Sequence, residues 1–500
     1  MRRLVIALLA ATALGACTMM PHYERPQSPV PNRWPADTPA PAAGAVAAPG
    51  AGAAPPIVSA DQIGWRDFFT DPRLQRLIVI ALENNRNLRI AVLNVSASEA
   101  QFRIERGNLF PAIAATGSGL SERLPANGGI PLGGAGGSSG NALVPSGAGA
   151  TTFRYYTAGI GFTNYELDLF GRQRSLTTQA FEQYLAQGES RRSTQISLVA
   201  EVASDYFAVL ADEVLVKITQ ETLQSETESY QLTQAMYAHD TTTLLSLRQA
   251  ESAVDAARAS LAQYQRQLAQ DGHALTLVLG QEVPADLPSG KDLSAEGLLA
   301  AVPEGLPSEL LTHRPDVLGA EHTLRAANAN IGAARAAFFP EIQLTASGGT
   351  ASGRLNGLFR AGTGTWTFAP TITLPIFNGG QNVANLDLAR IEKNVAVAQY
   401  ELAIQTAFRE VSDALSARGT YVEQRHAQEA LVAADAEAVR LAQMRFRSGV
   451  DSYLATLDAE RSLYSAQQGL VSVRQAELAN RVTLYKALGG GWQQNTTSGG

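Results

Sequence analysis

Few residues of this chain are of the types that enzymes use for chemistry. The sequence of 500 residues has one cysteine and six histidines. The histidines show no metal-ligand spacing, and neither a GxSxG nucleophile motif nor a glycine-rich phosphate loop is present. No enzymatic activity, metal site or cofactor is therefore predicted, apart from the lipid discussed next. The histidines are His22, His239, His273, His313, His322 and His426.

The single cysteine directly follows a targeting segment. Two arginines near the start precede an apolar run, Leu4 to Leu14, and the letters LGAC then end at Cys17. This motif resembles the lipobox of bacterial lipoproteins, which implies a signal peptide over residues 1–16, cleavage before Cys17 and covalent lipid on that residue. Thr18, in place of Asp, resembles outer-membrane sorting. The alternative is an ordinary secretory signal whose cysteine lies there by chance.

Composition narrows the class of protein. Only 17% of residues are charged and 7% are aromatic, which favours long Ala-rich helices over several aromatic cores. Removal of the two arginines in residues 1–16 leaves 37 basic and 46 acidic residues, so nucleic acid is not a predicted partner. Beyond the targeting segment no apolar run approaches 18 residues, so no transmembrane helix is expected.

The chain repeats itself after a Pro/Ala/Gly linker at residues 35–58. Phe110-Pro111 recurs as Phe339-Pro340, 229 residues later, and further on the separation becomes 209 residues and stays fixed. We interpret this as a tandem duplication. The second set of matches pairs Leu245, Ala250-Glu251, Ala257, Leu261, Leu275 and Leu279-Gly280 with Leu454, Ala459-Glu460, Ala466, Leu470, Leu484 and Leu488-Gly489.

Each half has the predicted order helix, strand, loop, strand, long helix, tight turn, helix. The long stretches 172–238 and 379–447 lack proline and have helical apolar spacing, so we expect them to pack side by side as coiled coils. His313 precedes Arg314-Pro315, which is typical of a helix start. The predicted strands are 111–121, 154–168, 340–348 and 365–376.

The strands alternate apolar side chains with small or hydroxylic ones. This pattern suits a transmembrane β-strand with a lipid face and a wet face, although a small soluble sandwich is the alternative. Open sheet edges are not tolerated in hydrocarbon, and four strands are too few to close a barrel. If the strands enter a membrane, several chains must therefore share one barrel.

Several segments together resemble the TolC-like outer-membrane factors, in their lipoprotein (OprM/NodT-like) branch. The resemblance spans nearly the whole mature chain and is most specific in HRPDVLGAEHTLRAANANIGAARAAFFPEIQL and RFRSGVDSYLATLDAERSLYSAQ. It implies an α+β membrane protein that forms a homotrimer with a 12-stranded β-barrel and a 12-helix tunnel. It further implies an outer-membrane exit duct for small molecules such as drugs, with a periplasmic adaptor protein and an inner-membrane pump of the resistance-nodulation-division type as partners.

The predicted domains follow the duplication. They are a signal peptide at 1–16, a lipid-anchored segment and linker at 17–58, a first repeat at 59–283, a connector at 284–312, a second repeat at 313–490 and a tail at 491–500.

The resemblance also implies where the tunnel closes. It places Leu454 and Asp458 at a periplasmic constriction, where three copies would form an apolar ring and an acidic ring, with Arg461 available for ion pairing. The alternative is that Asp458 and Arg461 are a solvated i,i+3 pair. Some family members carry a second acidic residue where this chain has Ala455, which makes the expected acidic ring sparser.

The tight turns near 238–243 and 448–451 are the expected adaptor-docking sites. The first turn lacks the glycine of the second, so adaptor contacts there are less well defined by the resemblance. The docking residues are His239, Asp240, Thr241, Ser448, Gly449 and Val450.

Two other functions stay open on the sequence. One is a structural periplasmic lipoprotein tether without a pore, against which the alternating strands argue. The other is the exit duct of a type I protein-secretion system, against which the lipobox and the HRPDV segment argue.

Overall fold

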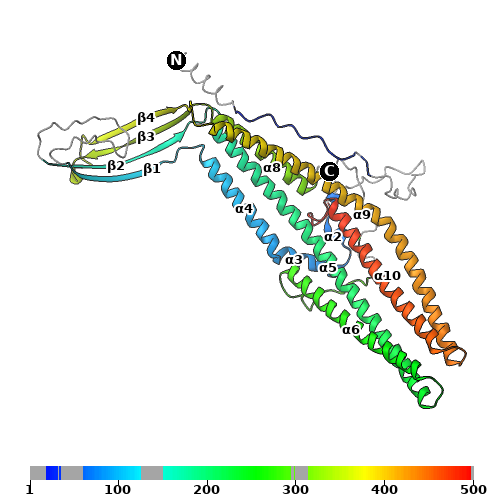
Figure 1. Cartoon of the computed structure of the whole chain (residues 1–500). Helices are drawn as coiled ribbons and strands as arrows, with labels where there is room; N and C mark the ends of the chain where they lie inside the picture. Colours follow the sequence, from blue (N-terminus) through cyan, green and yellow to red (C-terminus); the bar gives the residue numbers. More distant parts are fainter. Residues whose placement is uncertain are drawn as a thin grey trace. The chain divides into compact units, whose positions relative to one another are not determined.

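The computed structural model (Figure 1) describes most of the mature chain. The expected signal peptide, Cys17, the linker at 35–58 and much of the connector lie outside the described residues. Among the described residues, none of the helices is long and apolar enough to cross a membrane. The described residues are 18–31, 33–34, 60–124, 150–293, 298 and 313–496.

The chain divides into two compact units, and each contains segments from both halves of the duplication. The first unit holds the described parts of Met1–Glu24, Ser98–Gln183 and Arg325–Val395. The second holds the described parts of Arg25–Ala97, Tyr184–Leu324 and Ala396–Gly500.

The duplication is visible in the lengths and positions of the helices (Figure 1). α4 and α8 each have 22 residues, and both ends of α8 lie 229 positions after those of α4. α5 and α9 each have 67 residues, and their ends are 209 positions apart. The two predicted separations are thus also those of the elements. The helices are α4 (Arg86–Gly107), α5 (Arg172–Ala238), α6 (Leu244–Leu279), α8 (Pro315–Ala336), α9 (Gln381–Arg447) and α10 (Tyr453–Ala487).

The first unit contains a four-stranded antiparallel sheet in the order β1-β2-β3-β4. The four strands are predicted from the sequence, but their ends differ by several residues; the fourth, for example, stops at Thr373, before Pro375. Pro370 lies within β4 opposite Leu344, and it is tolerated because β4 is an edge strand. The strands are β1 (Ala114–Leu124), β2 (Thr151–Glu166), β3 (Glu341–Ser352) and β4 (Gly364–Thr373).

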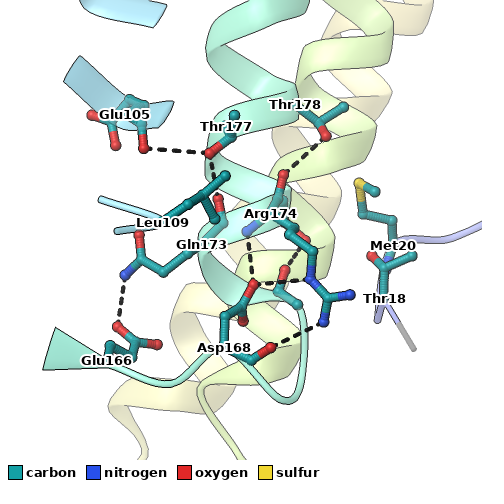
Figure 2. A network of polar contacts seen from close by, with 12 residues as sticks. Thr18, Met20, Glu105, Leu109, Glu166, Asp168, Gln173, Arg174, Thr177 and Thr178 are labelled. Atoms are coloured by element: carbon teal, nitrogen blue, oxygen red, sulfur yellow. Dashed lines mark hydrogen bonds and ion pairs between the residues drawn. The ribbon is translucent and has the colours of Figure 1, made fainter. Parts of the chain in front are cut away.

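A polar network fixes the passage from β2 into α5 (Figure 2). The backbone N–H and the Nε of Arg174 both donate to Asp168 Oδ2, at 2.9 and 3.1 Å. Gln173 Nε2 donates to Glu166 Oε2 at 2.6 Å. These contacts satisfy donors in the first turn of α5, which have no partner within the helix.

The duplicated Phe-Pro motif has a packing role in the second half. The ring of Phe339 stacks on that of Phe170, with centroids 4.8 Å apart, directly before β3 begins at Glu341. The motif therefore packs beside the junction of helix and strand, where the sequence predicts a change of secondary structure.

The second unit is built around an aromatic core, contrary to the expectation from composition. Trp65, Phe68 and Tyr485 are almost fully buried, and the rings of Phe68 and Tyr485 stack with centroids 3.9 Å apart. Few aromatic residues suffice because they are concentrated here. The short elements of this core are η1 (Ala60–Gln62), α2 (Trp65–Phe68) and α3 (Pro72–Asn84).

The HRPDV segment joins three helices in the second unit. α8 begins at Pro315, as predicted. The buried guanidinium of Arg314 donates to the carbonyl of Ala487 at 2.7 Å and forms ion pairs with Asp316 and Glu410 at 2.6 and 2.9 Å. This arrangement pairs the buried cation and links α8 to α9 and α10.

Candidate functional site at the helix turns

The turn between α5 and α6 closes with a pair of backbone hydrogen bonds. The N–H of Thr241 donates to the carbonyl of Met236 at 2.9 Å, and that of Asp240 to the carbonyl of Tyr237 at 3.0 Å. These are the two bonds of a Schellman motif. His239, Asp240 and Thr241 are exposed, so they form an accessible tip.

The turn between α9 and α10 has the same hydrogen bonds. Val450 donates to Arg445 at 3.0 Å, and Gly449 to Phe446 at 2.9 Å. Ser448, Gly449 and Val450 are exposed. The side chain of Arg445 donates to both carboxylate oxygens of Asp451, at 2.5 and 2.9 Å, and thereby holds the pKa of Asp451 below its ordinary value.

The missing glycine in the first turn does not change the backbone there. Asp240 has φ 56° and Gly449, 209 positions later, has φ 68°. A non-glycine residue in this left-handed region is strained, although Asp tolerates it better than most. The two docking turns expected from the sequence therefore have matching backbones and different side chains.

The three expected gate residues lie on α10. Leu454, whose surface is 47% exposed, and Asp458 are one helical turn apart, so they share a face. Asp458 and Arg461 are both exposed. Within the part of the chain that the structure describes, no ion pair joins these two side chains, so the solvated i,i+3 pair does not form in the single chain.

The other face of α10 is buried. Tyr453 and Leu457 lie at 3% and 1% exposure and form a small core with Ala250 and Ala253 of α6. Partly buried Tyr230 of α5 and Phe446 of α9 pack against this core. The gate face thus belongs to a helix that is packed against three others directly behind the turn.

Two buried glutamates lie beside this small core. Glu226 of α5 is 4% exposed and Glu460 of α10 is 8% exposed. Tyr453 donates to Glu226 Oε2 at 3.3 Å. Ser225 and Gln443 donate to Glu460 Oε1 at 3.3 and 2.9 Å, whereas Glu460 Oε2 is buried without a hydrogen-bond partner.

Burial shifts both carboxyl groups toward the protonated form. Burial, and after it the charge of Glu460, raise the pKa of Glu226 to about 7, although Tyr453 and the charge of Arg461 act in the opposite direction. Burial also raises the pKa of Glu460. The sequence analysis did not single out these residues. Their signal was spacing, because Glu460 follows Tyr453 and Leu457 at i+7 and i+3 on the buried face.

The N-terminal segment lies against α8 in the first unit. Asn328 Nδ2 donates to the carbonyl of Pro21 at 2.9 Å, and Arg335 Nη1 to that of Met19 at 3.3 Å. Figure 2 includes Thr18 and Met20, which begin this segment. Cys17, the expected lipidation residue, immediately precedes it and lies outside the described residues.

The described residues contain no group of three or more His, Cys, Asp or Glu side chains that could hold a metal ion. His239 is exposed at the first turn. His426 is exposed and lies 3.7 Å from Glu429. No arrangement typical of a metalloenzyme is therefore visible in this part of the chain.

Long paired helices, an antiparallel four-stranded sheet and exposed helix turns are features of a channel protein of the bacterial outer membrane. A family model described as "Outer membrane efflux protein" matches residues 77–281 and 306–490. The chain belongs to this family, as the sequence resemblance predicts.

Similar proteins agree with this assignment. The probable efflux pump outer membrane protein TtgC of Pseudomonas putida is 49% identical over 490 residues, covering 98% of this chain and 96% of the relative. The outer membrane protein OprJ of Pseudomonas aeruginosa is 42% identical, with the same coverage. The crystal structure of the open state of the MtrE outer membrane channel of Neisseria gonorrhoeae is 39% identical, with a TM-score of 0.83, and covers 96% of this chain and 100% of that one.

The chain is therefore an outer-membrane efflux channel protein with a TolC-like fold. The expected location in the outer membrane and the expected function as an efflux duct are confirmed at the level of the family. The family is one of transport proteins and has no known cofactor.

Proposed function

We propose that three copies of this chain form one duct, with a shared 12-stranded β-barrel in the outer membrane and a 12-helix tunnel in the periplasm. The observation that carries this proposal is the open sheet. β1 and β4 each pair with only one neighbour within the described chain, and unpaired strand edges in hydrocarbon cost several kcal/mol per backbone group. Partner copies would satisfy these edges.

The side chains of β4 support its insertion in lipid. Trp366, Phe368 and Ile372 lie on one face of the strand and are 78%, 59% and 67% exposed. Their alternation with threonines gives one apolar and one hydroxylic face, as a lipid-facing barrel strand requires. The large exposed apolar area has no obvious role in a tether, so this strand favours the duct.

The periplasmic end would be closed at the α9–α10 turn. Three copies of Leu454 would form an apolar ring that resists wetting, and three copies of Asp458 an acidic ring that favours cations. Arg461 would provide ties between copies, because in the single chain it forms no ion pair with Asp458 among the described residues.

The two exposed turns would bind the periplasmic adaptor of a tripartite pump. Their matching backbones suit contacts that repeat around the ring, through His239, Asp240 and Thr241 in the first turn and the Ser448–Val450 stretch in the second. The relatives are named as antibiotic, toluene and solvent efflux proteins. We extend small apolar cargo of this kind to the present chain, driven by an inner-membrane pump of the resistance-nodulation-division type.

Lipid on Cys17 would add a second attachment to the outer membrane. The predicted domain limits, from the signal peptide at 1–16 to the tail at 491–500, belong to the same proposal. Replacement of Cys17 by Ser separates the two attachments, because a duct stays in the outer-membrane fraction through its barrel whereas a tether becomes soluble.

The mass and outline of the particle in mild detergent test the assembly. Light scattering and negative-stain imaging should give a three-chain tube. A monomer or a loose rod would refute the duct.

Single-channel conductance tests the gate. Leu454→Ala and Asp458→Ala should each raise conductance, because they remove bulk or charge from the constriction. The matched control is Leu245→Ala, which changes the corresponding exposed leucine of the first half. Equal conductance in all three variants and the unmodified protein would overturn the gate while leaving the duct intact.

A further inference from the structure

We propose that Glu226 and Glu460 form a proton-dependent clasp that holds α10 against α5 directly behind the α9–α10 turn. The proposal rests on the proposed gate for its effect on transport, but its structural basis is independent of the gate. It assigns a regulatory role to two residues that the resemblance does not point to.

The clasp is a set of contacts between helices far apart in the sequence. Tyr453, the first residue of α10, donates to Glu226 of α5. In the reverse direction Ser225 of α5 donates to Glu460 of α10, and Gln443 of α9 donates to the same carboxylate oxygen. Three helices are therefore tied together through two carboxyl groups.

Both carboxyl groups line one cavity of about 190 Å³ between α5, α9 and α10. They are close enough for the charge of one to disfavour ionisation of the other. Two buried carboxylates in such a site repel each other, and the usual solution in proteins is that a proton remains on the pair. We infer that the packed arrangement of α10 and α5 requires at least one proton there.

The surrounding groups supply little compensating positive charge. From α10, Tyr464 lines the cavity, and the charge of Arg461 acts on Glu226 from an exposed position. From α5, Glu221 adds another acid to the lining. α6 contributes only alanines to the adjoining small core, and the α9 contact, Gln443, is neutral.

The direction of the pH effect follows from the raised pKa. The carboxyl of Glu226 has a pKa of about 7 in the packed state and an ordinary value of 4.5. The packed state is therefore favoured at acidic pH and loses this advantage as the pH rises toward and through 7. Because α10 carries Leu454 and Asp458, loosening of the clasp would also loosen the proposed gate.

Hydrogen exchange of the detergent-solubilised full chain tests the clasp without reference to transport. After correction for intrinsic exchange, local opening of residues 453–461 should increase on the order of tenfold from pH 6 to pH 8, as the linkage of one proton allows. Glu226→Gln and Glu460→Gln are isosteric and uncharged, so each should abolish most of this dependence while keeping the helix protected.

Glu251→Gln is the matched control. Glu251 lies 209 positions before Glu460, at the corresponding place in α6, but its side chain is 42% exposed and forms an ion pair with Arg248. This variant should keep the full pH dependence. A pH dependence that persists in both Glu226→Gln and Glu460→Gln, or that disappears equally in Glu251→Gln, would overturn the clasp.

Conductance at the same two pH values separates the clasp from the gate. If both are correct, conductance rises with pH in the unmodified protein and stays constant in Glu226→Gln. If exchange behaves as expected and conductance does not follow, the clasp stands and the assignment of the gate to α10 fails.

Discussion

Gly332→Ala should release the N-terminal segment from α8. A Cβ at position 332 would lie 2.5 Å from Met20 Cγ, 2.6 Å from Ser175 Oγ and 2.9 Å from the backbone nitrogen of Met20. Side-chain rotation cannot relieve the contact with a backbone atom. The segment that follows the expected lipidation residue, Cys17, must therefore move away from the helix.

The size of the effect follows from the contacts that this movement breaks. The hydrogen bonds from Asn328 and Arg335 to carbonyls of the segment are worth about 1 kcal/mol each. The guanidinium of Arg325 lies 5.1 Å from the ring centroid of Tyr23, and such a contact adds about 0.5–1 kcal/mol. The sum of about 2–3 kcal/mol corresponds to about a 30- to 150-fold increase in the released population.

Proteolysis by a glutamate-specific protease measures that population. The cleavage rate after Glu24 tracks the fraction of open segment when opening is fast relative to cleavage, so the rate should rise by the same factor. Gly319→Ala is the control on the same helix, since its Cβ would meet no atom closer than 3.6 Å. Equal rates in Gly332→Ala, Gly319→Ala and the unmodified protein would refute the seating of the segment on Gly332.

Two further predictions concern the turns and the buried acids of α5. Asp240→Gly should raise stability by about 0.5–1 kcal/mol and Gly449→Asp should lower it by a similar amount, because both positions have positive φ; thermal unfolding of the purified protein measures both, and effects of the same sign would contradict the reasoning. Burial, and after it Asp271, raise the pKa of Asp212 to about 7 from an ordinary 3.8. Its contribution to stability is thus present below about pH 4 and lost as the pH rises through 7, so Asp212→Asn should flatten the decline in melting temperature between pH 5 and pH 8. An unchanged decline would show that other groups cause it.

Much of the architecture could be predicted from the sequence, because local and periodic patterns decide it. The proline-free stretch at 172–238 has the apolar spacing of a helix, and α5 has those bounds. The separations of 229 and 209 residues reappear in the element ends, because duplicated segments carry the same start and stop signals. Strand ends were less accurate, since alternation does not specify which residues pair.

The candidate site was only partly predictable. Exposure of the turns and of the Leu454 face follows from helical periodicity and resemblance. The backbone of Asp240 did not, because a missing glycine suggested a different turn, whereas the pair of Schellman hydrogen bonds imposes the same one.

Burial was decided by tertiary structure alone. Glu251 and Glu460 occupy the same place in the two repeats, yet one side chain is solvent-exposed and ion-paired while the other is enclosed with Glu226. The difference arises because Glu460 faces α5 and α9, including Ser225, a residue 235 positions away. Sequence determined which residues lie on one helix face, and the packing of distant helices determined which of those faces excludes water and shifts the pKa values of its acids.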